Sequence, residues 1–458
     1  MNELETLRTI EQPVKATSSS TASLAQRDST AARGARSKIA LFGHFGWGNF
    51  GNESTLQAML YHLRRLAPDA EFNCICTGPE TVAAGYNISA VPSKDVLVQP
   101  WALRDPLARW ARKLVIGIPI EVYRWLKGFK SLWGTDALVV PGTGLLNDAY
   151  TLFHWGPYDL FRWAATAKLC RCNLLFISVG AGPVYSRIGR FLVKTALSLA
   201  DFRSYRDEST LRYLKGIGFR AEQDRVYPDL AFSLPESLIP RGHDSKGHRL
   251  VVGLGLMEYA GKYSVEKPSD AIYAAYLETL VEFVKWLLAH EYNVRLLIGD
   301  LVDAPVTRHF KSLLKERSGW PEKGRIIDEP IASVEDLLSQ LATTDLVVAT
   351  RFHNVLLALL LNRPVISISF HHKCVSLMSQ MGLSEYCQDI NHLKPERLIE
   401  QFCQLEKNAA SLRPMIRQKA EGCRKALDEQ YHLILQNLGP PYRHLERGRQ
   451  IPGLVRQL

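Results

Sequence analysis

Short runs of apolar, often β-branched residues recur along the chain and alternate with longer segments of helical periodicity. This alternation is typical of parallel βα units, whose strands are buried on both faces. The strands that we expect cover residues 39–42, 71–76, 136–140, 173–179, 200–206, 250–256, 294–299, 325–327, 347–349 and 365–368. The helices that we expect cover residues 54–66, 209–216, 270–290, 334–341, 354–361 and 394–437. The pattern predicts an α/β fold of doubly wound parallel sheets.

A polar segment with Pro and Gly, residues 234–248, divides these elements into two sets. We therefore predict two Rossmann-like domains that face a cleft, and we expect the charged helical region 394–437 to pack back across it. The predicted parts are a disordered leader (1–37), an N-terminal domain (38–235), a C-terminal domain with closing helices (248–436) and a loose tail (437–458). An organelle-targeting role for the leader is a weaker hypothesis, because Glu3, Glu5 and Glu11 oppose it.

Cationic and titratable side chains follow two neighbouring strands of the second set. Arg351 and His353 come after strand 347–349, and Lys373 comes after strand 365–368. Because the carboxyl ends of parallel strands meet at one edge of a sheet, we expect the three side chains to lie together. Two fixed cations and an imidazole suit an anion site beside a proton donor. The alternative is a surface Arg, a histidine at a helix start and a solvated Lys.

A glycine-rich loop, residues 43–53, joins the first expected strand to the first expected helix. Glycine permits positive φ and close approach of a ligand, and the helix N-terminus attracts anions. The spacing is neither G-x-G-x-x-G nor a P-loop. We expect a substrate or phosphate loop, the alternative being a flexible surface turn. The candidate binding residues are Gly48, Asn49, Gly51, Asn52 and Glu53.

Further strand ends of the first set carry glycine or arginine. The segments PGTG (141–144), GAGP (180–183) and RDE (206–208) follow three of its strands. These ends should share one rim, which adds Gly142, Gly144 and Arg206 as candidates, with Asp148 near them.

Charge narrows the classes of partner. The chain has 56 Lys and Arg against 46 Asp and Glu, a net charge of +10, but no basic run with interleaved aromatics, so we do not expect nucleic-acid binding. A basic surface suits an anionic donor, an acidic glycan or anionic lipid. Residues 114–125 are amphipathic within a basic, aromatic stretch. They would lie on a membrane surface or form an insertion packed on its own domain, and Pro119 is expected to interrupt any helix.

The cellular compartment is predicted from what the sequence lacks. There is no secretory signal pattern and no run of about 18 apolar residues. The eight cysteines lack zinc spacing and suit buried free thiols in a reducing compartment. We expect a cytoplasmic protein, with a peripheral contact at the inner face of the plasma membrane as a hypothesis.

With these motifs in place, the chain resembles the polysaccharide pyruvyl transferase family over residues 38–390. The resemblance rests on the order of GNFGNE, DALVVPGTGLLND, GAGP, SYRDESTLRYL, PDLAF, TRFHN and FHHK. It implies a two-domain fold like that of the GT-B glycosyltransferases, with the active site in the cleft. It also implies transfer of the enolpyruvyl-derived group of phosphoenolpyruvate to a sugar, which forms a pyruvate ketal and releases phosphate.

The resemblance assigns roles to individual residues. Arg351 and His353 match the family's R-x-H motif and are the expected catalytic residues, while Lys373 and Arg206 match its donor-binding cations. The chain departs from the usual pattern in having Asn52 for the Asp of G-D-E and Phe370 for a Tyr, and in having PGTG at 141–144 for Gly-Gly. No metal and no cofactor besides the donor are implied.

The implied acceptor is a surface polysaccharide, an exopolysaccharide or its lipid-linked precursor. Two alternatives remain open at this point: a GT-B-type glycosyltransferase that uses a nucleotide sugar, and a non-catalytic subunit of a glycan assembly.

Overall fold

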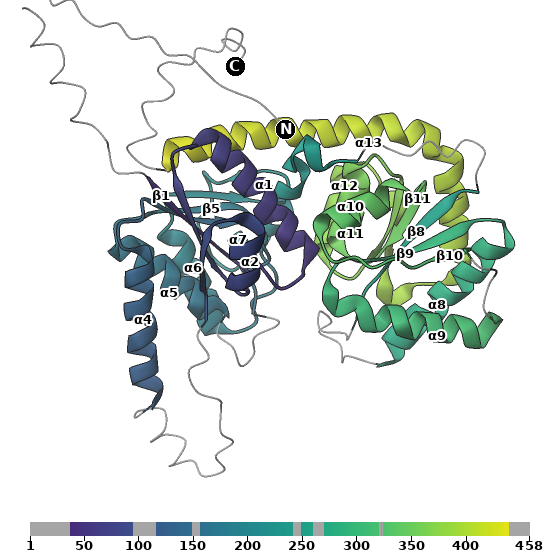
Figure 1. Ribbon diagram of the computed structural model, residues 1–458, viewed down its shortest axis with the longest axis horizontal. Helices are drawn as coiled ribbons and strands as arrows, with labels where there is room; N and C mark the ends of the chain where they lie inside the picture. Colours follow the sequence, from purple (N-terminus) through teal and green to yellow (C-terminus); the bar gives the residue numbers. More distant parts are fainter. Residues whose placement is uncertain are drawn as a thin grey trace, which may run out of the picture. The chain divides into compact units, whose positions relative to one another are not determined.

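The first of two parallel sheets is built from the N-terminal half of the chain. The structure is a computed structural model (Figure 1), which describes residues 37–94, 116–148, 156–240, 249–259, 270–319, 322 and 324–438. The strand order is β3-β2-β1-β4-β5-β6-β7, and the order reverses between β1 and β4. The strands are β1 (Lys38–Gly43), β2 (Glu71–Cys76), β3 (Ser89–Pro92), β4 (Ala137–Pro141), β5 (Asn173–Val179), β6 (Phe202–Tyr205) and β7 (Arg225–Val226).

The second sheet has the order β10-β9-β8-β11-β12-β13 and is also parallel, with its reversal between β8 and β11. Its strands are β8 (Val251–Leu256), β9 (Asn293–Ile298), β10 (Ile326–Ile327), β11 (Leu346–Ala349), β12 (Val365–Ser369) and β13 (Cys387–Asp389). The prediction of doubly wound parallel sheets is confirmed. The edge strands β3 and β13 were not predicted, because neither is a continuous apolar run.

Helices connect the strands on both sides of each sheet. The α-helices are α1 (Phe50–Leu66), α2 (Pro79–Tyr86), α4 (Ile118–Leu132), α5 (Gly156–Leu169), α6 (Arg187–Ser198), α7 (Glu208–Gly216), α8 (Asp270–Ala289), α9 (Ala304–Ser318), α10 (Val334–Ala342), α11 (Phe352–Leu360), α12 (His372–Gln380) and α13 (Pro395–Asn437). The 3-10 turns are η2 (Leu230–Ser233), η3 (Glu236–Leu238), η4 (Leu301–Asp303), η5 (Ser384–Tyr386) and η6 (Ile390–His392).

Helix starts near the expected site differ from the predicted ones. Helix α1 begins at Phe50 instead of residue 54, because the Asn49 side chain caps it by accepting from Asn52 N. Lys373, which we expected in a loop, lies in the first turn of α12. Pro119 does not interrupt a helix: it stands in the first turn of α4, where proline has no hydrogen bond to lose. Residues 95–115, the rest of the basic aromatic stretch, lie outside the described residues.

The two faces of the first sheet pack into two separate hydrophobic clusters. On β1, Ala40 and Phe42 pack with α4–α7, while Ile39 and Leu41 pack with α1 and α2. The second of these clusters continues without a break into the second sheet, including Val347 and Val355. One hydrophobic core therefore joins α1 to the elements that carry the R-x-H motif.

Helix α13 bonds to both sheets, as we expected for residues 394–437. Gln430 Nε2 donates to Ser204 Oγ at 2.7 Å, at the end of the first sheet. Glu406 accepts from Tyr292 OH at 2.8 Å, beside the second sheet. The helix thus ties the two halves together. The expected leader (1–37) and tail (437–458) lie almost entirely outside the described residues, and the domain boundaries stay predictions.

Candidate active site

The glycine-rich loop is held by side chains of its own helix. Gly46 and Gly48 have φ of +82° and +76°, the left-handed region that favours glycine. Glu53 Oε1 accepts from Gly46 N at 2.6 Å, and burial raises the pKa of Glu53. Asn52 Nδ2 donates to His44 O at 2.9 Å. The side chains of Asn52 and Glu53, predicted to contact substrate, thus fix the shape of the loop.

The same loop docks on the end of β9 in the second sheet. Phe50 N donates to Gly299 O at 3.1 Å, and Leu301 N donates to Gly48 O at 3.0 Å. Asn49 Nδ2 donates to Asp300 Oδ2 at 2.6 Å. A side chain at Gly48 would overlap Leu301. The close approach that glycine permits here is an approach between the two halves of the protein.

Gly51 lies against the ring of His353. A methyl group at Gly51 would overlap Nδ1 of the imidazole. Gly51 is in the first turn of α1, and His353 is in the first turn of α11, where Arg351 is the N-cap. The two predicted motifs therefore meet in space, and the absence of a side chain at position 51 makes room for the histidine.

We expect Gly51→Ala to lower turnover at least about tenfold, because the methyl group must displace the imidazole or the start of α1. The backbone of Gly51 is helical, so alanine itself fits its φ and ψ. Gly422→Ala is the matched control, since a methyl group there meets open space within α13. It should leave turnover unchanged and raise the free energy of unfolding by about 0.5–1 kcal/mol. Wild-type turnover in Gly51→Ala would show that the contact is unimportant.

Arg206 and His353 share one buried carboxylate. Asp229 Oδ2 lies 3.3 Å from Arg206 Nη1 and 3.8 Å from His353 Nε2. Its other oxygen accepts from Ala231 N at 3.0 Å. Within the described part of the chain, Arg206 Nε and His353 Nε2 are buried without a hydrogen-bond partner. Asp229 was not among the predicted site residues, although it follows a strand within the PDLAF motif.

Two cations meet over one aromatic ring. The Arg206 guanidinium carbon lies 5.1 Å from the centre of the Phe352 ring, and Lys373 Nζ lies 5.4 Å from it. Lys373 Nζ is also 5.2 Å from the centre of Phe370. Such contacts stabilise a cation without neutralising it. Among the described residues, no carboxylate lies within 4.0 Å of Lys373 Nζ. Phe352 contacts both cations and is therefore part of the site, although it was not among the predicted site residues.

Arg351 is engaged by a buried carboxylate. Its Nε donates to Asp303 Oδ2 at 2.8 Å, and its Nη2 donates to Asp303 Oδ1 at 2.6 Å. This two-point pairing locks the guanidinium at the start of α11. Asp303, which is fully buried, was not predicted and stands in the segment after β9. Arg351 thus lies beside Arg206 and Lys373, and like Arg206 it is paired with a buried carboxylate.

Burial sets the protonation of this cluster. Burial is the largest cause that lowers the pKa of His353 to about 4, and Lys373, Arg206 and Arg351 lower it further against the opposing effect of Asp229. Burial also lowers the pKa of Lys373 to about 8, with Arg206 and Arg351 acting in the same direction. At neutral pH the imidazole is therefore neutral and Lys373 is charged. The expectation of a protonated His353 concerned the complex with the donor and stays a prediction.

The remaining candidates lie at the neighbouring rim. Gly142 packs against Ser178 O, and Gly182 packs against Asn147 and His371. Asp148 accepts from Tyr185 N at 2.8 Å and Ser186 N at 3.0 Å, so its carboxylate holds the start of α6. Gly144 belongs to the same turn, where its carbonyl accepts from Asn147 Nδ2. The structure gives Asp148 no contact with Arg206, Arg351, His353 and Lys373, which we call the cationic cluster.

We expect acid to destabilise the protein through its buried histidines. Burial lowers the pKa of His371 to about 3, far below the ordinary value of 6.5. The unfolded chain then binds more protons than the folded one at pH below 6.5, so stability falls as pH falls through this window. His371→Asn keeps an N-cap acceptor for Lys373 N and removes the titration. When the pH is lowered from 7.5 to 5, the free energy of unfolding of His371→Asn should fall by about 2 kcal/mol less than that of wild type. Urea titrations at the two pH values measure this difference.

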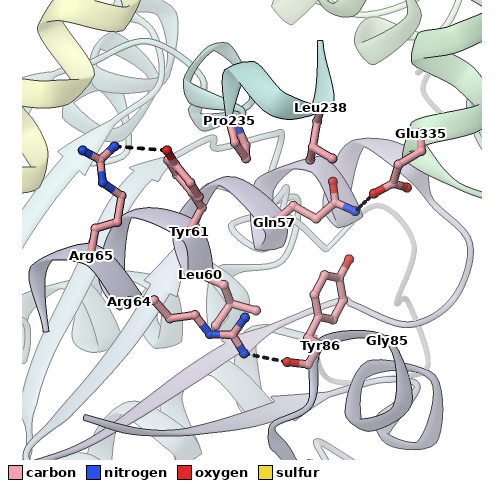
Figure 2. Close-up of a pocket in the computed structure, with 10 residues that line it drawn as sticks. All are labelled: Gln57, Leu60, Tyr61, Arg64, Arg65, Gly85, Tyr86, Pro235, Leu238 and Glu335. Carbon is pink, nitrogen blue, oxygen red and sulfur yellow. Dashed lines mark hydrogen bonds between the residues drawn. The ribbon is translucent and has the colours of Figure 1, made fainter. Parts of the chain in front are cut away.

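A cavity of about 390 Å³ lies away from this cluster, between α1, α2, η3 and α10 (Figure 2). None of the predicted site residues lines it. Its polar groups bond largely to one another: Arg64 Nη2 donates to Tyr86 O at 2.6 Å, and Gln57 Nε2 donates to Glu335 Oε1 at 2.9 Å (Figure 2). We therefore place the candidate site at the cationic cluster.

Two classes of feature are absent from the described residues. No group of three or more His, Cys, Asp or Glu side chains there could hold a metal ion. None of the described helices is both long and apolar enough to cross a membrane.

Known proteins of the same fold are distant in sequence. A structure of a putative UDP-N-acetylglucosamine 2-epimerase from Listeria monocytogenes has a TM-score of 0.58 at 13% identity, covering 90% of this chain and 98% of that one. A glycosyltransferase from Rickettsia africae has a TM-score of 0.51 at 12% identity, covering 88% and 99%. At this identity the likeness concerns the fold alone. It confirms the prediction of two Rossmann-like domains arranged as in GT-B proteins.

Sequence comparison gives the family. The amylovoran biosynthesis protein AmsJ of Erwinia amylovora is 20% identical over 400 residues, which cover 79% of this chain and 90% of that protein. Residues 49–372 match the polysaccharide pyruvyl transferase family. This match begins within the glycine-rich loop, includes the R-x-H motif and ends at His372, the first residue of α12. The chain belongs to the polysaccharide pyruvyl transferase family.

Proposed function

We propose that the protein transfers the enolpyruvyl-derived group of phosphoenolpyruvate to a sugar of a surface polysaccharide or exopolysaccharide, or of its lipid-linked precursor. The products are a pyruvate ketal and inorganic phosphate. Family membership supports a transferase that acts on polysaccharide, and the donor is inferred from the chemistry of the site. Because the donor is a cytosolic metabolite, we propose a cytoplasmic site of action.

The observation that carries this proposal is the set of unsatisfied polar groups in the cationic cluster. Arg206 Nε and His353 Nε2 are buried without a hydrogen-bond partner among the described residues, each facing a carboxylate only at 3.6 Å (Asp207) and 3.8 Å (Asp229). Lys373 Nζ is held over two aromatic rings with no ion pair in the same part of the chain. Buried polar groups left in this state cost free energy unless a ligand completes them. A small, multiply charged anion with a phosphate and a carboxylate would do so.

The proposed reaction balances without an outside oxidant or reductant. One proton adds to the methylene carbon of the donor, which becomes the ketal methyl group. A sugar hydroxyl attacks the adjacent carbon, phosphate leaves with its bridging oxygen, and a second hydroxyl closes the ring. The two hydroxyl protons account for the proton on carbon and the proton on the released phosphate. These steps require anion binding and proton transfer, and no redox cofactor.

The residues of the cluster divide these tasks in the proposal. Arg206 and Lys373 bind the donor's charges. The donor's negative charge raises the pKa of His353, so the imidazole takes up a proton and acts as general acid, at the methylene carbon or the departing phosphate. Asp229 then stabilises the imidazolium from 3.8 Å. Arg351, locked by Asp303, fixes the start of α11 and adds positive potential at the site.

Donor choice separates this proposal from a glycosyltransferase. Isothermal calorimetry would titrate the purified chain with phosphoenolpyruvate and, separately, with UDP-glucose. We expect binding of the first and none of the second. Binding of the nucleotide sugar alone would overturn the proposal in favour of a glycosyltransferase, and binding of neither would favour a non-catalytic subunit.

The product is tested in the host. Mass spectrometry of the surface polysaccharide should show an increment that corresponds to a pyruvate ketal. The increment should disappear when the gene is deleted and should not return with a His353→Ala allele. An increment that persists after deletion would assign the reaction to another protein.

A further inference from the structure

Helix α4 presents apolar side chains to solvent. Ile118, Val122 and Leu126 are 54%, 53% and 63% exposed, and their spacing of four residues places them on one face. The packed side of the helix lies next to this stripe: Trp125 Nε1 donates to Tyr158 OH of α5 at 3.1 Å, and Gly128 lies against α5. The apolar stripe is therefore on the outside, the reverse of an ordinary surface helix.

Helix α6 also presents apolar side chains to solvent, near its start. Ile188 and Phe191 are 61% and 64% exposed, and Tyr185 just before the helix is also exposed. The exposed Arg187 and Arg190 alternate with them, and α6 contains no acidic residue. Apolar and aromatic side chains interleaved with arginines are typical of helices that lie in a lipid headgroup region.

The two helices belong to one side of the first sheet and begin at the same end of it. Helices α4, α5 and α6 pack on the same face of the sheet, with α5 in contact with both of the others (Figure 1). Helix α6 follows β5 and α4 precedes β4, so both helices start at the carboxyl edge. The start of α6 is five residues from Gly182, which lies against His371. The exposed apolar residues of α6 thus begin beside the rim of the candidate active site.

We propose that these faces of α4 and α6 form one surface that docks on an anionic lipid bilayer. We call it the lipid face, made of Ile118, Val122, Leu126, Ile188 and Phe191. Lipid fits better than a protein partner because the apolar residues stand on two separate helices, with basic residues on both. Lys127 and Lys130 supply the positive charge of α4, and Arg187 and Arg190 supply that of α6.

The consequence for catalysis rests on the proposed function. A chain docked through the lipid face would hold the carboxyl edge of the first sheet near the membrane surface. A lipid-linked acceptor could then reach the site without leaving the bilayer.

Vesicle flotation tests the lipid face directly. The full chain would be mixed with vesicles of neutral phosphatidylcholine or with vesicles that also contain phosphatidylglycerol, at low salt. We expect co-flotation with the anionic vesicles. Ile188→Ser/Phe191→Ser should lower the partition at least about tenfold, because apolar contact is lost. Arg187→Glu/Arg190→Glu should lower it by roughly the same factor on anionic vesicles only.

Two controls carry comparable changes elsewhere. Val302→Ser removes an exposed apolar side chain in η4, and Arg308→Glu reverses an exposed charge in α9. Both should float like wild type. Absence of wild-type flotation, or equal loss in the controls, would overturn the proposal. A change of oligomeric state in the α6 variants without any vesicle binding would also overturn it and point to a protein interface.

Calorimetry with phosphoenolpyruvate separates this proposal from the proposed function. We expect the α6 variants to bind the donor as wild type does. If the wild-type chain floats but does not bind the donor, the lipid face stands and the proposed function fails.

Discussion

His353→Ala is expected to lower turnover by roughly 10²–10⁴-fold, the usual contribution of a general acid, while donor affinity changes little. His353 lies within 3.8 Å of Asp229, which can stabilise its charged form. Burial lowers its pKa to about 4, so the free protein holds it neutral and donor binding must supply the charge that protonates it. The measurement is release of phosphate with the host's polysaccharide precursor as acceptor, together with donor calorimetry.

His371 and His372 are the matched comparisons, because they stand at the same rim. His371 Nδ1 accepts from Lys373 N at 3.3 Å as the N-cap of α12, and burial lowers its pKa to about 3. His372 is exposed. We therefore expect His372→Ala to turn over normally and His371→Ala to be weakened mainly through the placement of Lys373. If His353→Ala is active while His371→Ala or His372→Ala is inactive, the acid has been assigned to the wrong histidine.

Lys373→Ala and Arg206→Ala are each expected to weaken donor binding by about 2–5 kcal/mol, or roughly 30- to several-thousand-fold in Kd. Both cations lie over the Phe352 ring, desolvated, and their loss leaves a donor charge without its partner. Arg203→Ala is the control. Arg203 stands on β6, the strand that the RDE motif follows, and pairs with Asp224 at 2.9 Å, so its loss should affect stability and leave the donor Kd unchanged.

The pH dependence of donor binding checks the assignment of Lys373. Because burial lowers the pKa of Lys373 to about 8, wild-type affinity should fall as pH rises through that value and the ammonium loses its proton. Lys373→Arg should keep its affinity to higher pH, since arginine stays protonated. Wild-type donor affinity in both alanine variants would place the donor elsewhere.

Much of the architecture could be predicted because strand burial is a local property of the sequence. Runs such as 174–177 and 346–349 are apolar throughout, so they predict strands covered on both faces and hence parallel sheets. Parallel sheets bring strand ends to one edge. This reasoning brought Arg351, His353 and Lys373 together from spacing alone, and the structure places all three beside Arg206. Their roles toward a substrate stay predictions.

Helix starts and side-chain partners were less predictable. Asn49 caps α1 and draws residues 50–53 into the helix, and the position of Pro119 in a first turn depends on where α4 begins. The residues just before a helix can either join its first turn or stay in the loop. Which of the two is more stable depends on the cap and on what the helix packs against, so a local pattern does not decide where the helix begins.

The sequence by itself determined most of the strands, their parallel arrangement, and which cations reach the shared edge, because these follow from local patterns and the geometry of βα units. Only the tertiary structure decided that Gly51 makes room for His353, that Asp303 already pairs with Arg351, and that Asp229 lies between Arg206 and His353. These contacts join residues far apart in the chain. The pKa values of His353 and Lys373 follow from the same packing, since burial is their largest cause and no local pattern encodes it.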